Sequence, residues 1–179
     1  MFKKIFTGLV AAIVAFAVIV ATRPADYTVA RSTTIAAPQE VVFDQVNELK
    51  KWEAWNPWGK LDPNMKLTYE GPASGVGASY SWAGNSQVGE GRLTITESRP
   101  NELIRFKLEF FKPMAGVSTT EFSFKPQLDN TEVTWTMTGK NNFIGKAMCL
   151  FMSMDKMIGG QFESGLADLK TVSETAAKK

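Results

Sequence analysis

The chain has 179 residues, of which 44% are hydrophobic and 21% charged, a composition typical of a globular domain. It contains no histidine and a single cysteine, which excludes an intrachain disulfide, a multi-cysteine metal site and any nucleophile activated by histidine. The 20 basic and 18 acidic residues differ by two, and Lys3 and Lys4 supply that difference, so the rest of the chain is neutral. Because nucleic-acid binding requires a basic face, we expect no nucleic-acid partner.

The N-terminal segment has the pattern of a membrane anchor. Residues 5–22 are almost wholly apolar, follow Lys3 and Lys4, and end before Arg23. A helix of this length spans roughly 27 Å, close to the hydrocarbon core of a bilayer. Two lysines before the run and one arginine after it predict a single-pass membrane protein with its domain on the outer, periplasmic or extracellular, side. A cleaved signal peptide is the alternative and would give a secreted protein, although the end of the run fits a cleavage site only weakly.

The remainder of the chain reads as one domain. We assign residues 1–26 to the anchor and its linker, and residues 27–179 to that domain. Residues 27–35 alternate as a strand does, and Pro38 then begins a helix whose apolar stripe ends near Pro57.

The middle of the chain, from residue 65 to residue 140, alternates with a period of two and is punctuated by turn residues, the pattern of an antiparallel meander. After it, residues 144–175 carry apolar side chains at helical spacing, which predicts one long C-terminal helix. The predicted strands of the meander are Met65–Glu70, Ala78–Ala83, Gln87–Glu97, Glu102–Phe111, Val117–Pro126 and Glu132–Gly139.

This order of elements predicts an α+β fold, in which a curved seven-stranded antiparallel sheet wraps around the long C-terminal helix, preceded by an N-terminal transmembrane helix. If Leu93 and Ile95 point into the sheet's concave side, Gly89 and Gly91 do so too and leave room beneath the helix. A ligand cavity in that room is our prediction, because small molecules bind in such concave, apolar places. The alternative is that aromatic rings from other strands fill the space.

Several sequence motifs resemble a known superfamily. The resemblance is to the START-like (SRPBCC) superfamily, and within it to the polyketide cyclase/dehydrase and lipid-transport group. It covers the chain from Tyr27 to the end of the C-terminal helix. What it implies is a helix-grip fold and an apolar ligand, since members include lipid carriers, ligand-binding allergens, aromatase/cyclases and chaperone co-factors. The motifs are Ala37-Pro38-x-x-Val41-Val42-Phe43, Trp52-x-x-Trp55-x-Pro57-Trp58, Gly75-Val76-Gly77-Ala78 with Tyr80-x-Trp82, and the terminal helix.

Asp155 is the most unusual position in the predicted C-terminal helix, because a continuous helix places it in the middle of the apolar face between Phe151 and Phe162. It either anchors a polar group of a ligand or makes a structural hydrogen bond, or it reaches water through a bend at Gly159-Gly160. The tryptophans at positions 52, 55 and 58 either cover the cavity mouth, rest at the bilayer surface or pack in the core.

We predict membrane-tethered binding or transfer of a small apolar ligand (a lipid, an isoprenoid or a polyketide-like molecule), with the membrane contacted through residues 5–22. We assign no catalytic residue, no metal and no cofactor, and the sequence identifies no protein partner. One alternative is a cyclase or dehydratase that uses carboxylate and tyrosine chemistry through Asp155 and Tyr80. The other is a protein-interaction module at the membrane surface. The candidate cavity-lining residues are Trp55, Tyr80, Trp82, Leu93, Ile95, Phe106, Leu108, Trp135, Met148, Met152, Asp155 and Phe162.

Overall fold

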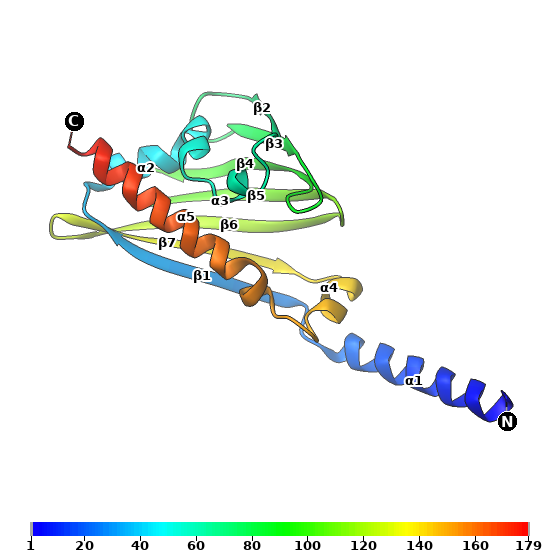
Figure 1. The fold of residues 1–179 in the computed structure, drawn as a ribbon. Coiled ribbons are helices and arrows are strands. Elements are labelled where there is room, and N and C mark those ends of the chain that lie inside the picture. The colour runs from blue at the N-terminus through cyan, green and yellow to red at the C-terminus, as the bar shows by residue number, and fades with distance from the viewer. Residues whose placement is uncertain (1, 179) are drawn as a thin grey trace.

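Helix α1 (Phe2–Thr22) projects from one end of a curved, seven-stranded antiparallel sheet that carries the long C-terminal helix on its concave side (Figure 1). The structure is a computed structural model and describes residues 2–178. Its strand order, β1-β7-β6-β5-β4-β3-β2, confirms the predicted curved sheet and long C-terminal helix. The elements after α1 are β1 (Asp26–Ile35), α2 (Gln39–Asn47), the 3₁₀ helix η1 (Leu49–Ala54), α3 (Pro57–Leu61), β2 (Lys66–Glu70), β3 (Ser79–Ala83), β4 (Glu90–Arg99), β5 (Leu103–Lys112), β6 (Gly116–Gln127), β7 (Asn130–Lys140), α4 (Phe143–Met148) and α5 (Met154–Ala176).

The strands form where the sequence alternates. The largest shift of a boundary is at β4, which begins at Glu90 rather than at Gln87. Gln87 belongs to a tight turn, in which the Gly89 backbone has φ +65° and its N–H donates to the Asn85 carbonyl at 2.8 Å. A residue in this left-handed region cannot continue a strand, so the ladder starts one residue later.

The cross-strand register defines two ends of the sheet. At the end we call the anchor end, Asp26 lies opposite Lys140 and Glu90 opposite Lys112. The β3–β4 turn, the β5–β6 turn and α4 all lie there, and only residues 23–25 separate α1 from β1. At the far end, α2 and the β6–β7 turn close the domain (Figure 1).

The predicted continuous C-terminal helix is wrong in one respect, because residues 149–153 interrupt it between α4 and α5. Ser153 acts as the N-cap of α5, where its Oγ accepts a hydrogen bond from the Lys156 N–H at 3.3 Å. The short α4 turns away from the sheet and packs against α1, where Val20 is fully buried and Lys146 Nζ donates to the Ala21 carbonyl at 3.2 Å. A lysine at this position also complements the carbonyl end of α1.

Large rings fill the half of the concave side that lies under α2 and η1. Trp52 meets Phe106 and Phe122 edge to face, with ring centroids 5.4 and 5.8 Å apart. Trp135 stacks on Phe162 of α5 at 4.1 Å and 7°, which fixes the helix on the sheet. The indole N–H of Trp52 donates to the Val46 carbonyl at 2.8 Å, so this ring is also held from the side of α2.

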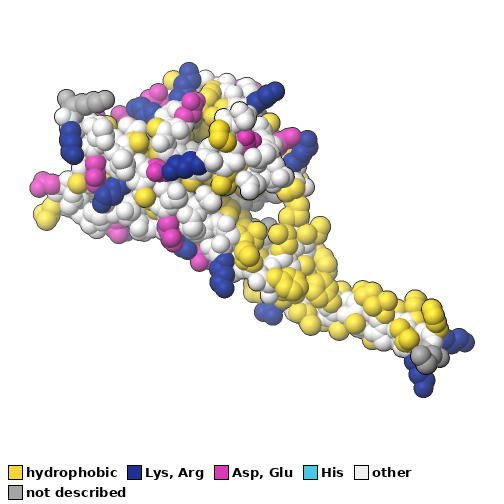
Figure 2. All heavy atoms as spheres, viewed as in Figure 1, with side chains coloured by type: hydrophobic (Ala, Val, Ile, Leu, Met, Phe, Trp, Pro, Cys, Tyr) yellow, Lys and Arg dark blue, Asp and Glu magenta, His cyan; other side chains and the backbone are white. Residues whose placement is uncertain are grey.

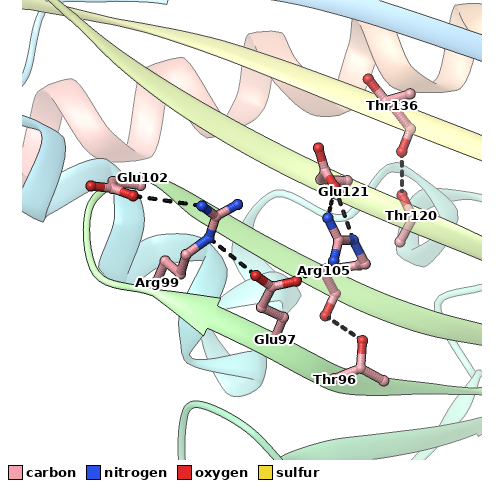
Figure 3. A network of polar contacts seen from close by, with 8 residues as sticks. All are labelled: Thr96, Glu97, Arg99, Glu102, Arg105, Thr120, Glu121 and Thr136. Atoms are coloured by element: carbon pink, nitrogen blue, oxygen red, sulfur yellow. Dashed lines mark hydrogen bonds and ion pairs between the residues drawn. The ribbon is translucent and has the colours of Figure 1, made fainter.

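The outer face of the sheet carries ion pairs that cross neighbouring strands (Figure 3). Arg105 of β5 donates to Glu121 of β6 from two nitrogens, at 2.8 and 3.0 Å, and also pairs with Glu97 of β4. The Arg99 Nε lies 3.1 Å from a Glu97 oxygen. Hydrogen bonds to Glu121 raise the pKa of Arg105, which stays charged. These partly exposed pairs fix the register more than they stabilise the fold.

Candidate functional site

A cavity of about 290 Å³ lies between the sheet and the first half of α5, on the side of the anchor end. It occupies the part of the concave face that the ring cluster under α2 leaves open. Its lining residues are Trp52, Asn56, Trp58, Met65, Tyr80, Trp82, Ser86, Gln87, Val88, Leu93, Leu108, Phe110, Lys112, Pro113, Thr120, Trp135, Met137, Ile158 and Phe162.

The walls are apolar because inward positions of five adjacent strands, from β3 to β7, meet there. Leu93 of β4, Leu108 of β5 and Met137 of β7 each stand on the concave face by strand alternation. Ile158 and Phe162, one turn apart on α5, close the cavity from above. Among the described lining residues, Lys112 at the edge of the cavity is the one charged side chain, so the interior favours an apolar guest.

Contrary to the prediction from the sequence, Gly91 does not leave room for a ligand beneath the helix. It faces Trp82 directly across β3 and β4, and a side chain at Gly91 would overlap both the Trp82 ring and the Glu109 carbonyl oxygen. The missing side chain therefore makes room for the Trp82 indole rather than for a ligand. Trp82 in turn forms a wall of the cavity, with its Nε1 donating to the Val88 carbonyl at 3.1 Å.

The polar atoms deep in the wall are satisfied by the protein itself. The Trp135 indole N–H donates to Thr120 Oγ at 2.8 Å, and the Thr120 hydroxyl donates to the Thr136 carbonyl at 3.0 Å (Figure 3 shows the second bond). Such a closed chain needs no partner from a ligand and behaves as apolar wall.

Tyr80 carries the polar atom best placed to meet a guest. Its ring is 7% exposed and lies between Tyr69 and Trp82, with centroids about 6 Å from each. Burial raises the pKa of Tyr80 above its usual value, while a hydrogen bond with the Asn56 side chain acts in the opposite direction. The hydroxyl therefore stays protonated at neutral pH and is able to donate or accept a hydrogen bond.

Four exposed residues mark the mouth of the cavity: Ser86 and Gln87 from the β3–β4 turn, Lys112 from the end of β5, and Pro113 from the β5–β6 turn. Both turns lie at the anchor end of the sheet. The Lys112 ammonium group pairs with Glu90 at 2.8 Å, which joins the two turns. The opening therefore faces the same end of the domain as α1.

A second cavity of about 190 Å³ adjoins the first and shares Trp52, Asn56, Met65 and Tyr80 with it. Its other walls are more polar and include Glu53, whose carboxylate accepts a hydrogen bond from Tyr69 Oη at 2.7 Å. Burial and this bond raise the pKa of Tyr69 above its usual value. Tyr80 thus lines both an apolar cavity and a more polar one.

Apart from Asp155, the predicted site residues fall into three groups. Trp55, Ile95 and Phe106 are buried in the core at the side of α2, not at the cavity. Met148 and Met152 lie outside it as well, because the break before α5 turns them toward α1 and solvent. Those that line the cavity are Tyr80, Trp82, Leu93, Leu108, Trp135 and Phe162.

The predicted position of Asp155 in the middle of an apolar face is wrong. It lies in the first turn of α5, half exposed, where its carboxylate accepts hydrogen bonds from Arg31 at 2.7 and 3.1 Å. These bonds hold the pKa of Asp155 below its usual value. The carboxylate is therefore ionised, paired and outside the cavity, which is the structural role that the sequence left open.

Sequence reasoning did not select several lining residues. Thr120 and Met137 share the inward face with Phe122 and Trp135, so strand alternation alone would have found them. The turn residues at the mouth carry no periodic pattern, and only the fold brings Ser86 and Lys112 together.

A curved antiparallel sheet that wraps around one long helix above an apolar cavity defines a helix-grip domain of the START-like class. The family model described as "Polyketide cyclase / dehydrase and lipid transport" matches residues 26–174, and the chain belongs to this family. Among curated proteins, none matches the chain.

Solved structures share the fold at low sequence identity. The di-domain ARO/CYC StfQ from the steffimycin biosynthetic pathway is 12% identical with a TM-score of 0.64, over 87% of this chain and 53% of that one. The Aha1 dimer from Colwellia psychrerythraea is 16% identical with a TM-score of 0.60, over 83% and 96%. Protein CV1439 from Chromobacterium violaceum is 16% identical with a TM-score of 0.58, over 82% and 96%.

Proposed function

We propose that this protein binds a compact apolar small molecule in the cavity beneath α5 and does so while tethered to a membrane by α1. The observation that carries the proposal is the cavity itself, which has an apolar lining and an opening at the end of the domain from which α1 projects. Membership of a family described by cyclisation and lipid transport supports an apolar ligand.

The size of the cavity narrows the class of ligand. Pockets for small molecules measure roughly 300–1,000 Å³, and this one, at about 290 Å³, lies at the lower limit. A single acyl or isoprenoid chain, or one fused-ring system, suits this volume better than a whole two-chain phospholipid. A ligand with one hydroxyl or carbonyl group could use the hydroxyl of Tyr80, a residue that lines both cavities.

The tether is supported by the length and composition of α1. This helix has 21 residues, an 18-residue stretch of it has a mean hydropathy of 2.6, and its side chains are exposed apart from the buried Val20 and the partly buried Ala17. At 1.5 Å per residue, 21 residues cover about 32 Å, the thickness of a bilayer core. The positions of Lys3 and Lys4 support an orientation with the domain outside.

An acid–base reaction through Asp155 is no part of this proposal, because Asp155 lies outside the cavity and is paired with Arg31. The described lining offers a neutral phenol and no carboxylate. This set of groups supports binding better than proton transfer.

The full chain in detergent or nanodiscs provides the test. Four of its five tryptophans line the cavity, so a brominated fatty acid that enters should quench much of the tryptophan emission. Extraction of the purified protein with organic solvent and mass spectrometry should recover a co-purified apolar molecule. The proposal is wrong if nothing is recovered and brominated ligands leave the emission unchanged.

Paired variants localise the binding. Leu108→Phe adds volume inside the cavity and should weaken binding about tenfold, which corresponds to about 1.4 kcal/mol. Leu128→Phe changes a fully exposed residue at the far end and should bind as the natural protein does. Equal affinities of the two variants would place the ligand elsewhere.

A further inference from the structure

Exposed apolar side chains gather at the anchor end of the domain. In Figure 2 the apolar surface of α1 continues onto the region around α4, whereas charged side chains are spread over the rest of the domain. Phe151, between α4 and α5, is 85% exposed. Isolated exposed apolar residues are ordinary, but a cluster of them indicates a contact surface. We define the membrane-facing rim as Phe111, Met114, Phe143, Ile144, Phe151 and Met152.

The rim is confined to one end of the molecule. Phe111 and Met114 flank the β5–β6 turn, and the other four belong to α4 and the segment that follows it. Among the described residues beyond α1, the large exposed hydrophobics at the opposite end are Val76 and Leu128, each alone in a turn. The rim side chains do not belong to the hydrophobic core, which is complete without them. Neither folding nor solubility therefore requires exposed apolar side chains to gather at one end.

The short connection between α1 and β1 limits how far the rim can move relative to α1. Residues 23–25 are the whole connection between α1 and β1, and three extended residues reach about 10 Å. The Ala25 carbonyl is also bound by the Asn141 N–H at 2.8 Å, and α4 packs on the last turn of α1. When α1 crosses a bilayer, the rim is therefore held at the surface of that bilayer.

The charges at this end favour a surface of anionic headgroups. Four acidic residues here are paired with basic ones: Asp26 with Lys140, Glu90 with Lys112, Glu109 with Lys107, and Asp155 with Arg31. A fifth, Asp62 beside the β3–β4 turn, is buried and accepts hydrogen bonds from the backbone N–H groups of Asn64 and Asn85. Among the described basic residues at this end, Arg23, Lys66, Lys146 and Lys156 make no such ion pair and outnumber the buried Asp62. Cations beside exposed aromatic and aliphatic side chains are the composition of interfacial membrane contacts.

We infer that the membrane-facing rim inserts into the outer leaflet of the bilayer that α1 crosses, and thereby seats the cavity mouth on the membrane. The mouth residues Ser86, Gln87, Lys112 and Pro113 lie at the same end as the rim. An apolar ligand then passes between bilayer and cavity without crossing bulk water. The inference rests on the proposed tether and adds to it the route by which the ligand enters.

The experiment uses the full chain in phosphatidylcholine/phosphatidylglycerol vesicles. In a Cys149→Ser background, Phe151→Cys and, separately, Met114→Cys are labelled with a polarity-sensitive fluorophore. Leu128→Cys, at the far end, is the matched control. We expect the two rim labels to shift to the blue and to lose intensity when the vesicles contain lipids spin-labelled near the headgroup, while the control label remains aqueous.

Flotation of the same vesicles separates the two claims. If the protein floats with the vesicles and both rim labels remain aqueous, the inference is overturned and the tether stands. If the protein does not float, both the tether and the inference fail. Two rim positions are used because a single substitution could perturb α4 locally, whereas the β5–β6 turn is an independent element.

Discussion

The guanidinium of Arg31 on β1 lies against the backbone of Gly159 on α5, at the place where the helix crosses the edge of the sheet. A side chain at position 159 would overlap Nη2 of Arg31. From this position the guanidinium reaches Asp155 at 2.7 Å on one side and Glu163 at 2.6 Å on the other, one helical turn before and after the glycine. Both carboxylates raise the pKa of Arg31, which therefore stays charged. Gly159 thus allows a single arginine to bind two turns of the helix that covers the cavity.

A pair of glycine substitutions tests this link. Gly160 is exposed and has open space around it, so Gly160→Ala should stabilise the protein by about 0.5–1 kcal/mol through helix propensity. Gly159→Ala gains the same propensity but displaces Arg31, so we expect a smaller gain or a loss. In an Arg31→Ala background, the two glycine substitutions should change the free energy of unfolding, measured with urea, by equal amounts. A persistent difference in that background would mean that Gly159 is needed for another reason.

Much of the sheet follows from local sequence. Each strand alternates on its own, as at Ile104, Phe106 and Leu108, and the turns carry glycine, proline or asparagine where the chain must reverse. Strand pairing then follows from the meander, and β1 pairs with β7 to complete the sheet. Except for the pairing of β1 with β7, these features are local, so they can be predicted from the sequence.

The errors concern contacts between residues far apart in the chain. Arg31 and Asp155 are 124 residues apart, and no spacing rule connects them. A single helix from 144 to 175 would place Asp155 on its apolar face. Ser153, however, is a good N-cap and marks the actual start of α5. Similarly, the space left by Gly91 is taken by Trp82, which the pairing of β3 with β4 places opposite it.

The ion pair between Asp155 and Arg31 should make the free energy of unfolding depend on pH in the acid range. The pKa of Asp155 is lower in the folded protein than the usual 3.8, so the folded state binds fewer protons there than the unfolded chain. The stabilisation is present above pH 3.8 and is lost as the pH falls through the lowered pKa. We therefore expect Asp155→Asn to destabilise the protein at pH 6 and to have progressively less effect toward pH 3. Asp129→Asn, in an exposed turn, is the control, and an Asp155→Asn effect that is constant with pH would contradict the pairing.

Gly91 should tolerate no side chain. Gly91→Ala would overlap the Glu109 carbonyl and the Trp82 ring, and overpacking of this kind costs about 1–3 kcal/mol. Gly116→Ala, which meets open space in the same sheet, is the matched control and should be close to neutral. Urea unfolding measures both. If Gly91→Ala were as stable as Gly116→Ala, the Trp82 ring would have to be mobile, and its place in the cavity wall would be in doubt.

The hydrogen-bond chain in the wall is open to a more specific test. Thr120→Val keeps the shape of the side chain but leaves the buried Trp135 indole N–H without an acceptor, which costs about 1–3 kcal/mol. Thr119→Val, on the outer face of the same strand, should change stability by less than about 0.5 kcal/mol. If the two variants are equally stable, another acceptor or a water molecule must replace Thr120.

Tyr80 provides the test of how polar a ligand the site accepts. Its side chain is buried and lines both cavities, and burial keeps the pKa of its hydroxyl above the usual value, so the hydroxyl is a neutral hydrogen-bonding group under ordinary conditions. Tyr80→Phe removes one hydrogen bond, worth about 0.5–1.5 kcal/mol, and should weaken binding of a fatty alcohol or ketone about two- to tenfold. Binding of a hydrocarbon of equal length should be unchanged, because it never used the hydroxyl. Tyr27→Phe is the control, since the Tyr27 hydroxyl bonds Ser118 at 2.8 Å and is not part of the cavity lining. Equal losses for the alcohol and the hydrocarbon would show that Tyr80 shapes the cavity and does not contact the polar group of a ligand.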